Sequence, residues 1–481
     1  MHPTTRHRLL RAIGAWAVVA SCSVASLAAC SPAADVPPGT QTPSASQTPD
    51  VEEETPEVGP DGFIMGVASH LMWSRARPSD GKGLAEIAIT EMGVQSLRDE
   101  ASWGEMDEPN WTTPLQPVAE HGGKVMLLLD YGNRRFMEGG GFPDTKEERA
   151  AFLQYASTVV TKVGPENLSG VEVWNEWDIY MGWPQRPAVG SPCPTDPQDK
   201  PGCPMMYVDL VEAMLYPERV GIDQPSFREA APGVPVIVNA ISARNPEWTE
   251  TVMTEMGKRG IEVDGAVVHP YVHAPDGCPG SSSAPAGADV AANCVHLVAE
   301  EVAEAYGSRV PVYVTEVGWS SYDFDGGVSE RGQAVNLVEL YVRVRATGDV
   351  GGVWWYDLIN DDGHEDPAEA QFGLMRRADP NYHLAVPGEL KPSGRAFAAL
   401  AGFWNECHSV DGSYKADNRE FTVICPDEPR QIILDAEEDE LDAAIDDGGT
   451  LVDLLGDLPE SSDAADVPEF VGRPVGVLPA A

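Results

Sequence analysis

Basic residues are scarce in this sequence of 481 residues. It contains 32 Lys and Arg against 76 Asp and Glu, which gives a formal net charge of -44 at pH 7. Proteins bind nucleic acids with clustered Lys and Arg, which neutralise the phosphates, and no basic stripe appears beyond the N-terminal segment. The composition therefore excludes nucleic acid as a partner. The negative charge identifies no ligand, because it often serves only to keep a secreted protein soluble.

The sequence also lacks the motifs of common metal sites. None of the eight cysteines forms a CxxC pair, and His273 and His296 lie near only one pair of cysteines, which argues against zinc. Two acidic loops, 323–326 and 361–366, lack the spacing of an EF-hand, so we interpret them as solvated loops. We therefore expect neither a metal nor another cofactor.

Near the N-terminus, the apolar stretch 12–20 is too short to span a bilayer. It follows a basic segment and precedes Leu27-Ala28-Ala29-Cys30, which resembles a bacterial lipobox. We expect a lipoprotein signal peptide over residues 1–29 and lipidation of Cys30, with an ordinary secretory signal as the alternative. Residues 30–61, rich in Pro, Ser, Thr and Glu, should form a disordered tether. The protein would then be extracytoplasmic and lipid-anchored to the bacterial cell membrane.

The remaining cysteines support export. Six are left once Cys22 is removed with the signal peptide and Cys30 carries lipid. Their order makes three local disulfides the simplest pairing, although six cysteines allow fifteen pairings. The expected disulfides are Cys193–Cys203, Cys278–Cys294 and Cys407–Cys425. Such bonds indicate an oxidising compartment.

Short apolar runs alternate with longer helix-period segments between residues 62 and 400, which is the pattern of repeated βα units. Eight runs can be counted, and this number closes a TIM barrel. They are 63–69, 94–97, 124–129, 170–174, 235–239, 265–268, 311–315 and 351–355. We therefore predict a (β/α)8 TIM barrel as the catalytic domain.

Polar and aromatic residues follow these runs at the strand ends, where TIM barrels carry their chemistry. Such a collar suits a carbohydrate, whose ring faces stack on aromatic side chains while its hydroxyls need amides and carboxylates. Any single member could instead serve packing, so the signal is their coincidence at one barrel face. The members are His70, Arg98, Asp99, Trp103, Asp130, Tyr131, Asn133, Asn175, Glu176, Asn239, His269, Tyr271, Glu316, Trp355, Tyr356 and Asn360.

Two collar residues are glutamates that close β-branched runs. Glu176 follows the fourth run, and Glu316 follows the seventh. Cleavage of a glycosidic bond with retention requires two carboxyl groups facing each other across one sugar, about 5 Å apart. This pair predicts an enzyme, a retaining glycoside hydrolase whose partner is a carbohydrate substrate.

Four segments, in this order, resemble clan A glycoside hydrolases. They are Trp174-Asn175-Glu176, Val268-His269-Pro270-Tyr271, Thr315-Glu316-Val317-Gly318-Trp319 and Trp354-Trp355-Tyr356-Asp357. Within the clan, segments 97–103 and 371–374 most resemble family 39 and its neighbours, families 5, 30 and 51. The resemblance spans about residues 62 to 400.

The resemblance implies roles for the matching residues. Glu176 on strand four would be the general acid/base, and Glu316 on strand seven would be the nucleophile. Arg98 and Tyr271 would hold and polarise Glu316. Asn175 would bind the sugar 2-hydroxyl, and His269 would line the same site. Trp355 would form an aromatic platform under the sugar. Tyr131 is a further candidate for sugar binding. A satisfied structural histidine is the alternative for His269.

After residue 400 the pattern changes to short alternating runs bounded by Gly, Pro and acidic clusters. We expect a small antiparallel β domain over residues 401–481, beside a barrel domain over 62–400. The expected strands are 420–424, 431–435, 441–445, 450–454 and 469–471. An acidic disordered tail over 435–466 is the alternative.

Two other classes of function compete with the glycosidase. A catalytically weak carbohydrate-binding lipoprotein on a TIM-barrel scaffold would be expected to lack a catalytic carboxylate. Both candidate carboxylates, Glu176 and Glu316, are present. A lyase or metalloenzyme would need a His-rich cluster or a strand-end Lys, and neither occurs at the motifs.

Overall fold

A computed structural model describes most of the chain after residue 61. All of the described residues belong to the compact unit Pro56–Ala481. The described ranges are 62–72, 83–108, 110–130, 132–133, 135–136, 142–178, 203–272, 287–323, 327–361, 367–378, 387–404 and 407–480. The predicted signal peptide, Cys30 and tether lie outside these ranges and stay predictions.

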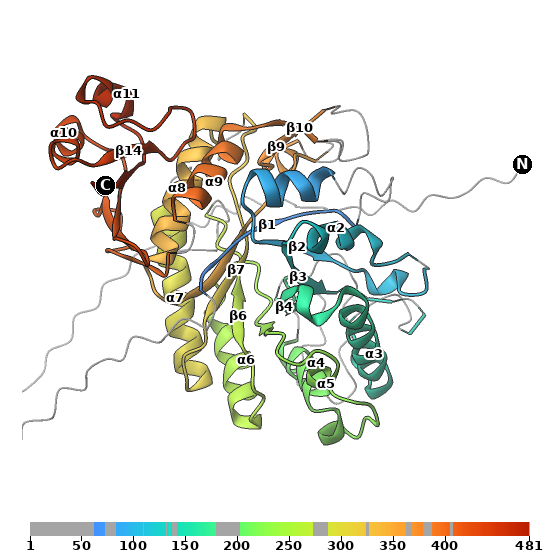
Figure 1. Cartoon of the computed structure of the whole chain (residues 1–481). Coiled ribbons are helices and arrows are strands. Elements are labelled where there is room, and N and C mark those ends of the chain that lie inside the picture. The colour runs from blue at the N-terminus through green and yellow to red at the C-terminus, as the bar shows by residue number, and fades with distance from the viewer. Residues whose placement is uncertain are drawn as a thin grey trace, which may run out of the picture. The chain divides into compact units, whose positions relative to one another are not determined.

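A closed barrel of parallel strands, arranged in sequence order from β1 to β8, forms the larger part of this unit (Figure 1). The strands are β1 Ile64–Ala68, β2 Ser96–Glu100, β3 Lys124–Leu129, β4 Leu168–Val173, β5 Val236–Val238, β6 Gly265–Val268, β7 Val312–Val317 and β8 Val350–Trp355. β1 pairs with both β2 and β8, which closes the barrel. The predicted TIM barrel is confirmed.

Helices cover the outside of the barrel (Figure 1); α2 to α8 lie between successive barrel strands, and α9 follows β10. They are α2 Gln116–Glu120, α3 Lys146–Val163, α4 Pro204–Leu215, α5 Phe227–Ala230, α6 Pro246–Arg259, α7 Ala288–Tyr306, α8 Glu330–Arg345 and α9 Pro392–Phe403. Local sequence fixes their ends: Thr145 and Glu148 form a capping box at the start of α3, and Gly260, with φ 60°, ends α6. No helix among the described residues is both long and apolar enough to cross a membrane.

Two strands extend into residues that the sequence placed just outside them. β2 contains Arg98 and Asp99, and β7 contains Glu316. The predicted strands ended where the apolar run ended, but the β2–β3 ladder continues through Arg98 and Asp99. In β7 the register with β8 is irregular between Val314 and Val317, the stretch that contains Glu316. The functional side chains are thus carried by the strands themselves.

A small cluster of buried residues fills the barrel interior below the polar layer. Its members are Met126, Ile237, Val267, Tyr313 and Trp354. The Trp354 indole donates to Ser96 Oγ (3.2 Å), and a Cβ at Gly66 would overlap the same ring. Because strand residues two apart share a face, Arg98 follows Ser96 on the interior face, one layer nearer the carboxyl ends.

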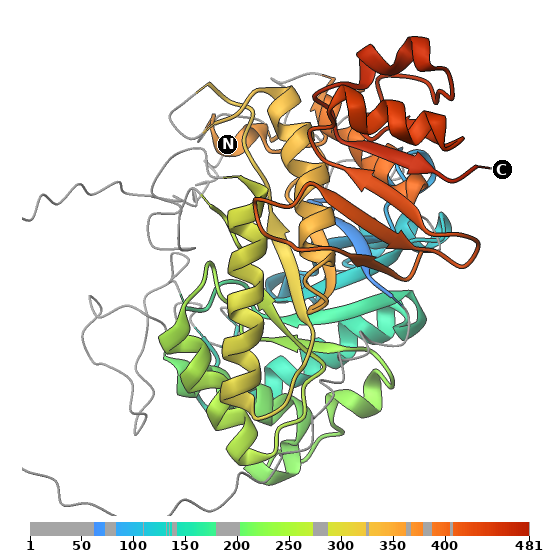
Figure 2. The ribbon, with the colours of Figure 1, turned by 90° about the vertical axis from the view of Figure 1, so that its left-hand side faces the viewer.

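The C-terminal region forms an antiparallel sheet of five strands, in the order β11-β12-β13-β15-β14, which packs against α8 and α9 (Figure 2). The strands are β11 Ser409–Asp411, β12 Glu420–Ile424, β13 Arg430–Ile433, β14 Thr450–Asp453 and β15 Val475–Leu478. A separate pair, β9 Met375–Arg377 and β10 Pro387–Leu390, precedes α9. The predicted antiparallel β structure at the C-terminus is confirmed.

Two of the strands predicted in this region are wrong. Residues 441–445 lie in helix α10 Glu438–Asp446, and 469–471 overlap helix α11 Val467–Phe470. Leu441, Ala444 and Ile445 are spaced by three and four residues, which is a helical period, and Glu437 and Glu440 form a capping box before them. The alternating apolar pattern of β15, in the interior of the sheet, was missed.

One of the three expected disulfides is confirmed. Cys407 and Cys425 are bonded, which ties the segment after α9 to the end of β12. Cys203 and Cys294 are also disulfide-bonded. Their predicted partners, Cys193 and Cys278, lie outside the described residues, so those two pairings stay predictions.

Candidate active site

Two glutamates from opposite sides of the barrel meet at the carboxyl ends of the strands. Glu176 follows β4, and Glu316 lies near the end of β7. One carboxylate oxygen from each, and one ring nitrogen of His269, lie within 4.8 Å of one another. Both Trp174 and Glu176 have positive φ angles, 70° and 45°, so the chain turns sharply after β4. Non-glycine residues rarely adopt this conformation, and they concentrate at functional sites.

Arg98 holds Glu316 in place from below. Its Nη1 donates to Glu316 Oε1 (2.7 Å), while its Nη2 also donates to Asn175 Oδ1 (3.0 Å). The hydroxyl of Tyr271 donates to the second oxygen of Glu316 (3.2 Å). Burial acts to raise the pKa of Glu316, but the positive charges of His269 and Arg98 outweigh it, so the pKa lies below its ordinary value. An ionised carboxylate with both oxygens held is the form a nucleophile needs.

A third carboxylate, Glu172 on β4, completes the support of this site. It is fully buried and accepts two hydrogen bonds from Arg98, at 2.6 and 3.0 Å. Burial again opposes ionisation, but the charge of Arg98 and the contact with His269 lower the pKa of Glu172 to about 2. The sequence interpretation missed this residue, although a charged side chain inside a buried parallel strand was a usable signal.

His269, at the end of β6, connects Glu176 to the rest of the network. Its Nδ1 lies 2.8 Å from Glu176 Oε1, and its Nε2 lies 2.9 Å from Thr315 Oγ1. Burial alone would lower the pKa of His269, but the surrounding carboxylates, Glu316 first among them, raise it to about 10. The imidazole is therefore protonated at neutral pH and donates from both nitrogens.

Several members of the predicted collar lie in the surrounding framework instead. Asp99 accepts from Ser69 Oγ and from the Leu71 amide, which ties the end of β1 to β2, and burial raises its pKa to about 7. Asn239 is fully buried, and its amide donates to Thr249 Oγ1. Such residues shape the barrel mouth without facing the two glutamates.

Tyr356 and Phe372 are two aromatic side chains that pack against Tyr271, a hydrogen-bond partner of Glu316. Of these, Tyr356 directly follows β8. Its ring is half-buried and lies edge-on to Tyr271, 6.4 Å between centroids. Trp355 is completely buried, donates to the Phe372 carbonyl (3.2 Å) and stacks on Trp319. That environment is typical of a packing residue, and the predicted contact of Trp355 with sugar stays a prediction. Tyr131 lies outside the described residues.

The two aromatic positions can be separated by experiment. We expect Trp355→Ala to lower the melting temperature strongly, because deleting a fully buried tryptophan typically costs about 3–5 kcal/mol. Tyr356→Ala should instead lower kcat/KM with a smaller change in melting temperature, since this ring is partly exposed beside Tyr271. Thermal unfolding and steady-state kinetics of both variants provide the test. A Trp355→Ala variant with unchanged stability but lost activity would identify Trp355 as the sugar platform.

Comparison with known proteins agrees with this architecture. No model of a known protein family matches the sequence, and no curated protein matches it. Solved structures do match. A family 39 glycoside hydrolase from the gut symbiont Bacteroides cellulosilyticus WH2 superposes with a TM-score of 0.58 at 19% identity, over 87% of this chain and 80% of that chain.

Two further structures match less closely. A monomeric beta-xylosidase from Caulobacter crescentus CB15 gives a TM-score of 0.54 at 16% identity, over 78% of this chain and 74% of that chain. A family 39 (GH39) enzyme from Xanthomonas axonopodis pv. citri gives 0.52 at 14% identity, over 78% and 72%. The chain therefore has the barrel fold of these family 39 glycoside hydrolases.

Proposed function

We propose that the protein is a retaining glycoside hydrolase that cleaves O-glycosidic bonds of a polysaccharide or oligosaccharide. The observation that carries this proposal is the approach of Glu176 and Glu316 to within 4.8 Å in unlike surroundings. Retaining enzymes place their two carboxyl groups about 5–5.5 Å apart, whereas inverting enzymes leave room for a water between them. The fold shared with family 39 enzymes supports the same reaction class.

In the first step, a Glu316 oxygen forms a bond to the anomeric carbon as the bond to the leaving oxygen breaks. Glu176 gives its proton to that oxygen. In the second step, water attacks the anomeric carbon, Glu176 takes the water's proton, and the bond to Glu316 breaks. The sugar leaves with its original configuration after two inversions.

The hydrogen bond to His269 distinguishes the two carboxyl oxygens of Glu176. Oε1 accepts from the protonated His269, so the acid proton belongs on Oε2. His269 thereby orients the acid, while Arg98 and Tyr271 fix the nucleophile. Asn175 precedes Glu176 in the chain and accepts from the arginine that also binds Glu316, which supports its proposed contact with the sugar 2-hydroxyl.

Product stereochemistry tests the proposal directly. A panel of aryl glycosides that includes β-xylosides should reveal a substrate, and proton NMR of the first-formed product should show retention of the anomeric configuration. Net inversion would contradict the assignment of Glu316 as nucleophile. Glycan binding without turnover of any substrate would favour the alternative, a carbohydrate-binding lipoprotein.

We also propose that lipid on Cys30 anchors the protein to the outer side of the bacterial cell membrane, as the lipobox predicts. Replacement of Cys30 by serine should move the protein from the membrane fraction to the soluble fraction. Cys22→Ser is the matched control, because Cys22 lies upstream of the lipobox and its replacement should leave the protein membrane-bound. A Cys30→Ser protein that stays in the membrane fraction would contradict lipidation.

A further inference from the structure

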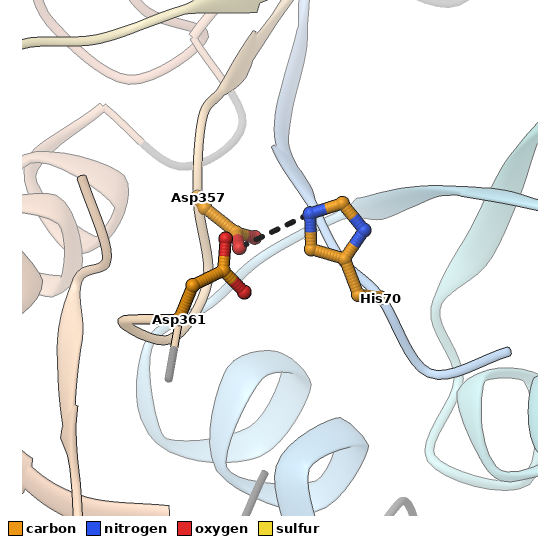
Figure 3. Close-up of side chains that lie close together, drawn as sticks. All are labelled: His70, Asp357 and Asp361. Atoms are coloured by element: carbon orange, nitrogen blue, oxygen red, sulfur yellow. Dashed lines mark ion pairs between the residues drawn. The ribbon is translucent and has the colours of Figure 1, made fainter. Parts of the chain in front are cut away.

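Three side chains that no step of the proposed reaction uses converge where the barrel closes. His70 follows β1, while Asp357 and Asp361 follow β8, its neighbour in the sheet. His70 Nε2 lies 3.4 Å from Asp357 Oδ2. One ligand atom from each of the three residues lies within 4.8 Å of the others, and Figure 3 shows the three side chains turned toward a common point. We refer to His70, Asp357 and Asp361 as the closure cluster.

One carboxylate oxygen of Asp357 accepts no hydrogen bond from the described residues. The residue is 2% exposed, and its Oδ1 accepts from the Leu358 amide. Its Oδ2, the atom that faces His70, has no hydrogen-bond partner among the described residues. Native proteins rarely leave a buried carboxylate oxygen in this state, because its desolvation costs several kcal/mol unless a donor or a cation compensates.

Arg377, a positive charge close to Asp357, makes its closest described contacts with other atoms. Arg377 Nη2 lies 3.8 Å from Asp361 Oδ1, and its Nε donates to the Asn360 carbonyl. This contact is too long for a strong hydrogen bond. Asp357 Oδ2 itself faces His70 at ion-pair distance, without a hydrogen bond from the described residues. The closure cluster therefore combines one imidazole and two carboxylates. One carboxylate oxygen, Asp357 Oδ2, is buried and faces the imidazole.

We propose that the closure cluster binds a divalent transition-metal ion of the Zn²⁺ type through His70 Nε2, Asp357 Oδ2 and one oxygen of Asp361. Zinc binds nitrogen and carboxylate oxygen at ~2.0–2.2 Å in tetrahedral geometry, which places ligand atoms roughly 3.3–3.5 Å apart. The observed 3.4 Å between His70 and Asp357 meets this requirement. Calcium prefers six to eight oxygen ligands, so an imidazole-containing set of three favours the transition metal.

This site was not expected from the sequence. The expectation of no metal rested on the absence of CxxC and EF-hand spacings. Both are local motifs, so they cannot detect ligands that come together only when the barrel closes. His70 and Asp357 are 287 positions apart in the chain, so their proximity has no local signature. Three protein ligands leave one position of a tetrahedral ion for water or for a sugar hydroxyl.

The ion would fix the loop after β8 to the end of β1. The His70 ring packs edge-on against Tyr356, 5.8 Å between centroids, and Tyr356 packs in the same way against Tyr271. Tyr271 in turn donates to Glu316. The bound metal thus holds the aromatic side chains beside the nucleophile and acts as a positioning element, not as a participant in glycosyl transfer.

Metal content and thermal stability test the site without relying on catalysis. The purified protein is stripped with EDTA, dialysed against ZnCl₂ and analysed for bound metal by mass spectrometry. We expect roughly one Zn²⁺ per chain and a rise of several degrees in melting temperature, because a ligand that binds only the folded state stabilises it. His70→Ala and Asp361→Asn should abolish both effects.

His296→Ala is the matched control. His296 also pairs with an aspartate, its Nδ1 lying 3.2 Å from Asp349 Oδ2, but this pair lies outside the closure cluster. The control should bind zinc like the unaltered protein. Each variant must match the metal-free parent in circular dichroism, which separates loss of metal from loss of fold.

The proposal is overturned if the parent binds no zinc, if it binds the same amount after His70→Ala, or if only CaCl₂ raises its melting temperature. Zinc binding in a protein that cleaves no glycoside would retain this site and reject the proposed function. If the zinc-free protein cleaves glycosides and zinc does not stabilise it, the proposed function is retained and the metal site is rejected.

Discussion

Replacement of Glu316 by alanine is expected to lower kcat by roughly 10⁴–10⁶-fold, the scale seen when a covalent nucleophile is removed. Among the described residues, neither of the two other carboxylates in this network can take over its role. Glu172, the nearest alternative, is fully buried and has both oxygens bound to Arg98. Glu176 cannot serve either, because the same side chain would have to donate the proton and attack the sugar.

Chemical rescue distinguishes this effect from misfolding. Azide or formate should enter the volume left by the Glu316 side chain and attack the anomeric carbon directly, giving an inverted glycosyl azide or product. Glu300→Ala provides a control, since Glu300 is half-exposed on α7, away from the two glutamates, and pairs with the exposed Arg309. We expect it to retain full activity. A Glu316→Ala enzyme with more than about one hundredth of the parent's kcat would contradict the assignment.

The sequence predicted the barrel well because its strands are buried on both faces. Such strands appear as continuous apolar runs, and each of the predicted runs overlaps one strand of the closed barrel. The two glutamates and their strand-end positions followed from the same pattern. Accuracy fell at the strand ends. The ladder of β2 continues through Arg98, and β7 continues through an irregular stretch that contains Glu316, although the apolar run has stopped.

The connections across the barrel were not readable from the sequence. Which side chains meet depends on the tilt and register of all the strands, so the contacts of Glu172 with Arg98 and His269 became evident only in three dimensions. The burial of Trp355 depends equally on the segment after β8, because the Phe372 carbonyl covers its indole nitrogen. The pattern of residue types along the sequence identifies candidate site residues, but the packing of the folded chain determines which of them can face the sugar.

Short apolar segments of the C-terminal region were ambiguous for a different reason. Residues 441–445 contain apolar side chains that fit both a strand and one face of a short helix. The capping box formed by Glu437 and Glu440 decides for the helix α10, because it satisfies backbone amides at the helix start. In this element the capping signal is therefore a better indicator of structure than the apolar pattern.

Replacement of Glu176 by alanine should give a kinetic pattern unlike that of Glu316→Ala. Loss of general acid catalysis typically costs ~10²–10⁴-fold, and the cost falls as the leaving group improves, because a stable leaving anion needs no proton. Glycosides of dinitrophenol should therefore still transfer their sugar to Glu316. The glycosyl-enzyme should then accumulate, since no base remains to activate water, and a burst of phenol followed by slow turnover should be seen.

The environment of Glu176 explains why a small anion should rescue this variant as well. Removal of the side chain frees the Nδ1 donor of the protonated His269, which had bound Oε1, so an anion in the vacated space finds a cationic partner. Azide should attack the glycosyl-enzyme from this side and give a glycosyl azide of retained configuration, the opposite of the product from Glu316→Ala. His269→Ala in the Glu176→Ala background should weaken the rescue. If azide gave the same anomer with both single variants, the assignment of acid/base and nucleophile to these two glutamates would be wrong.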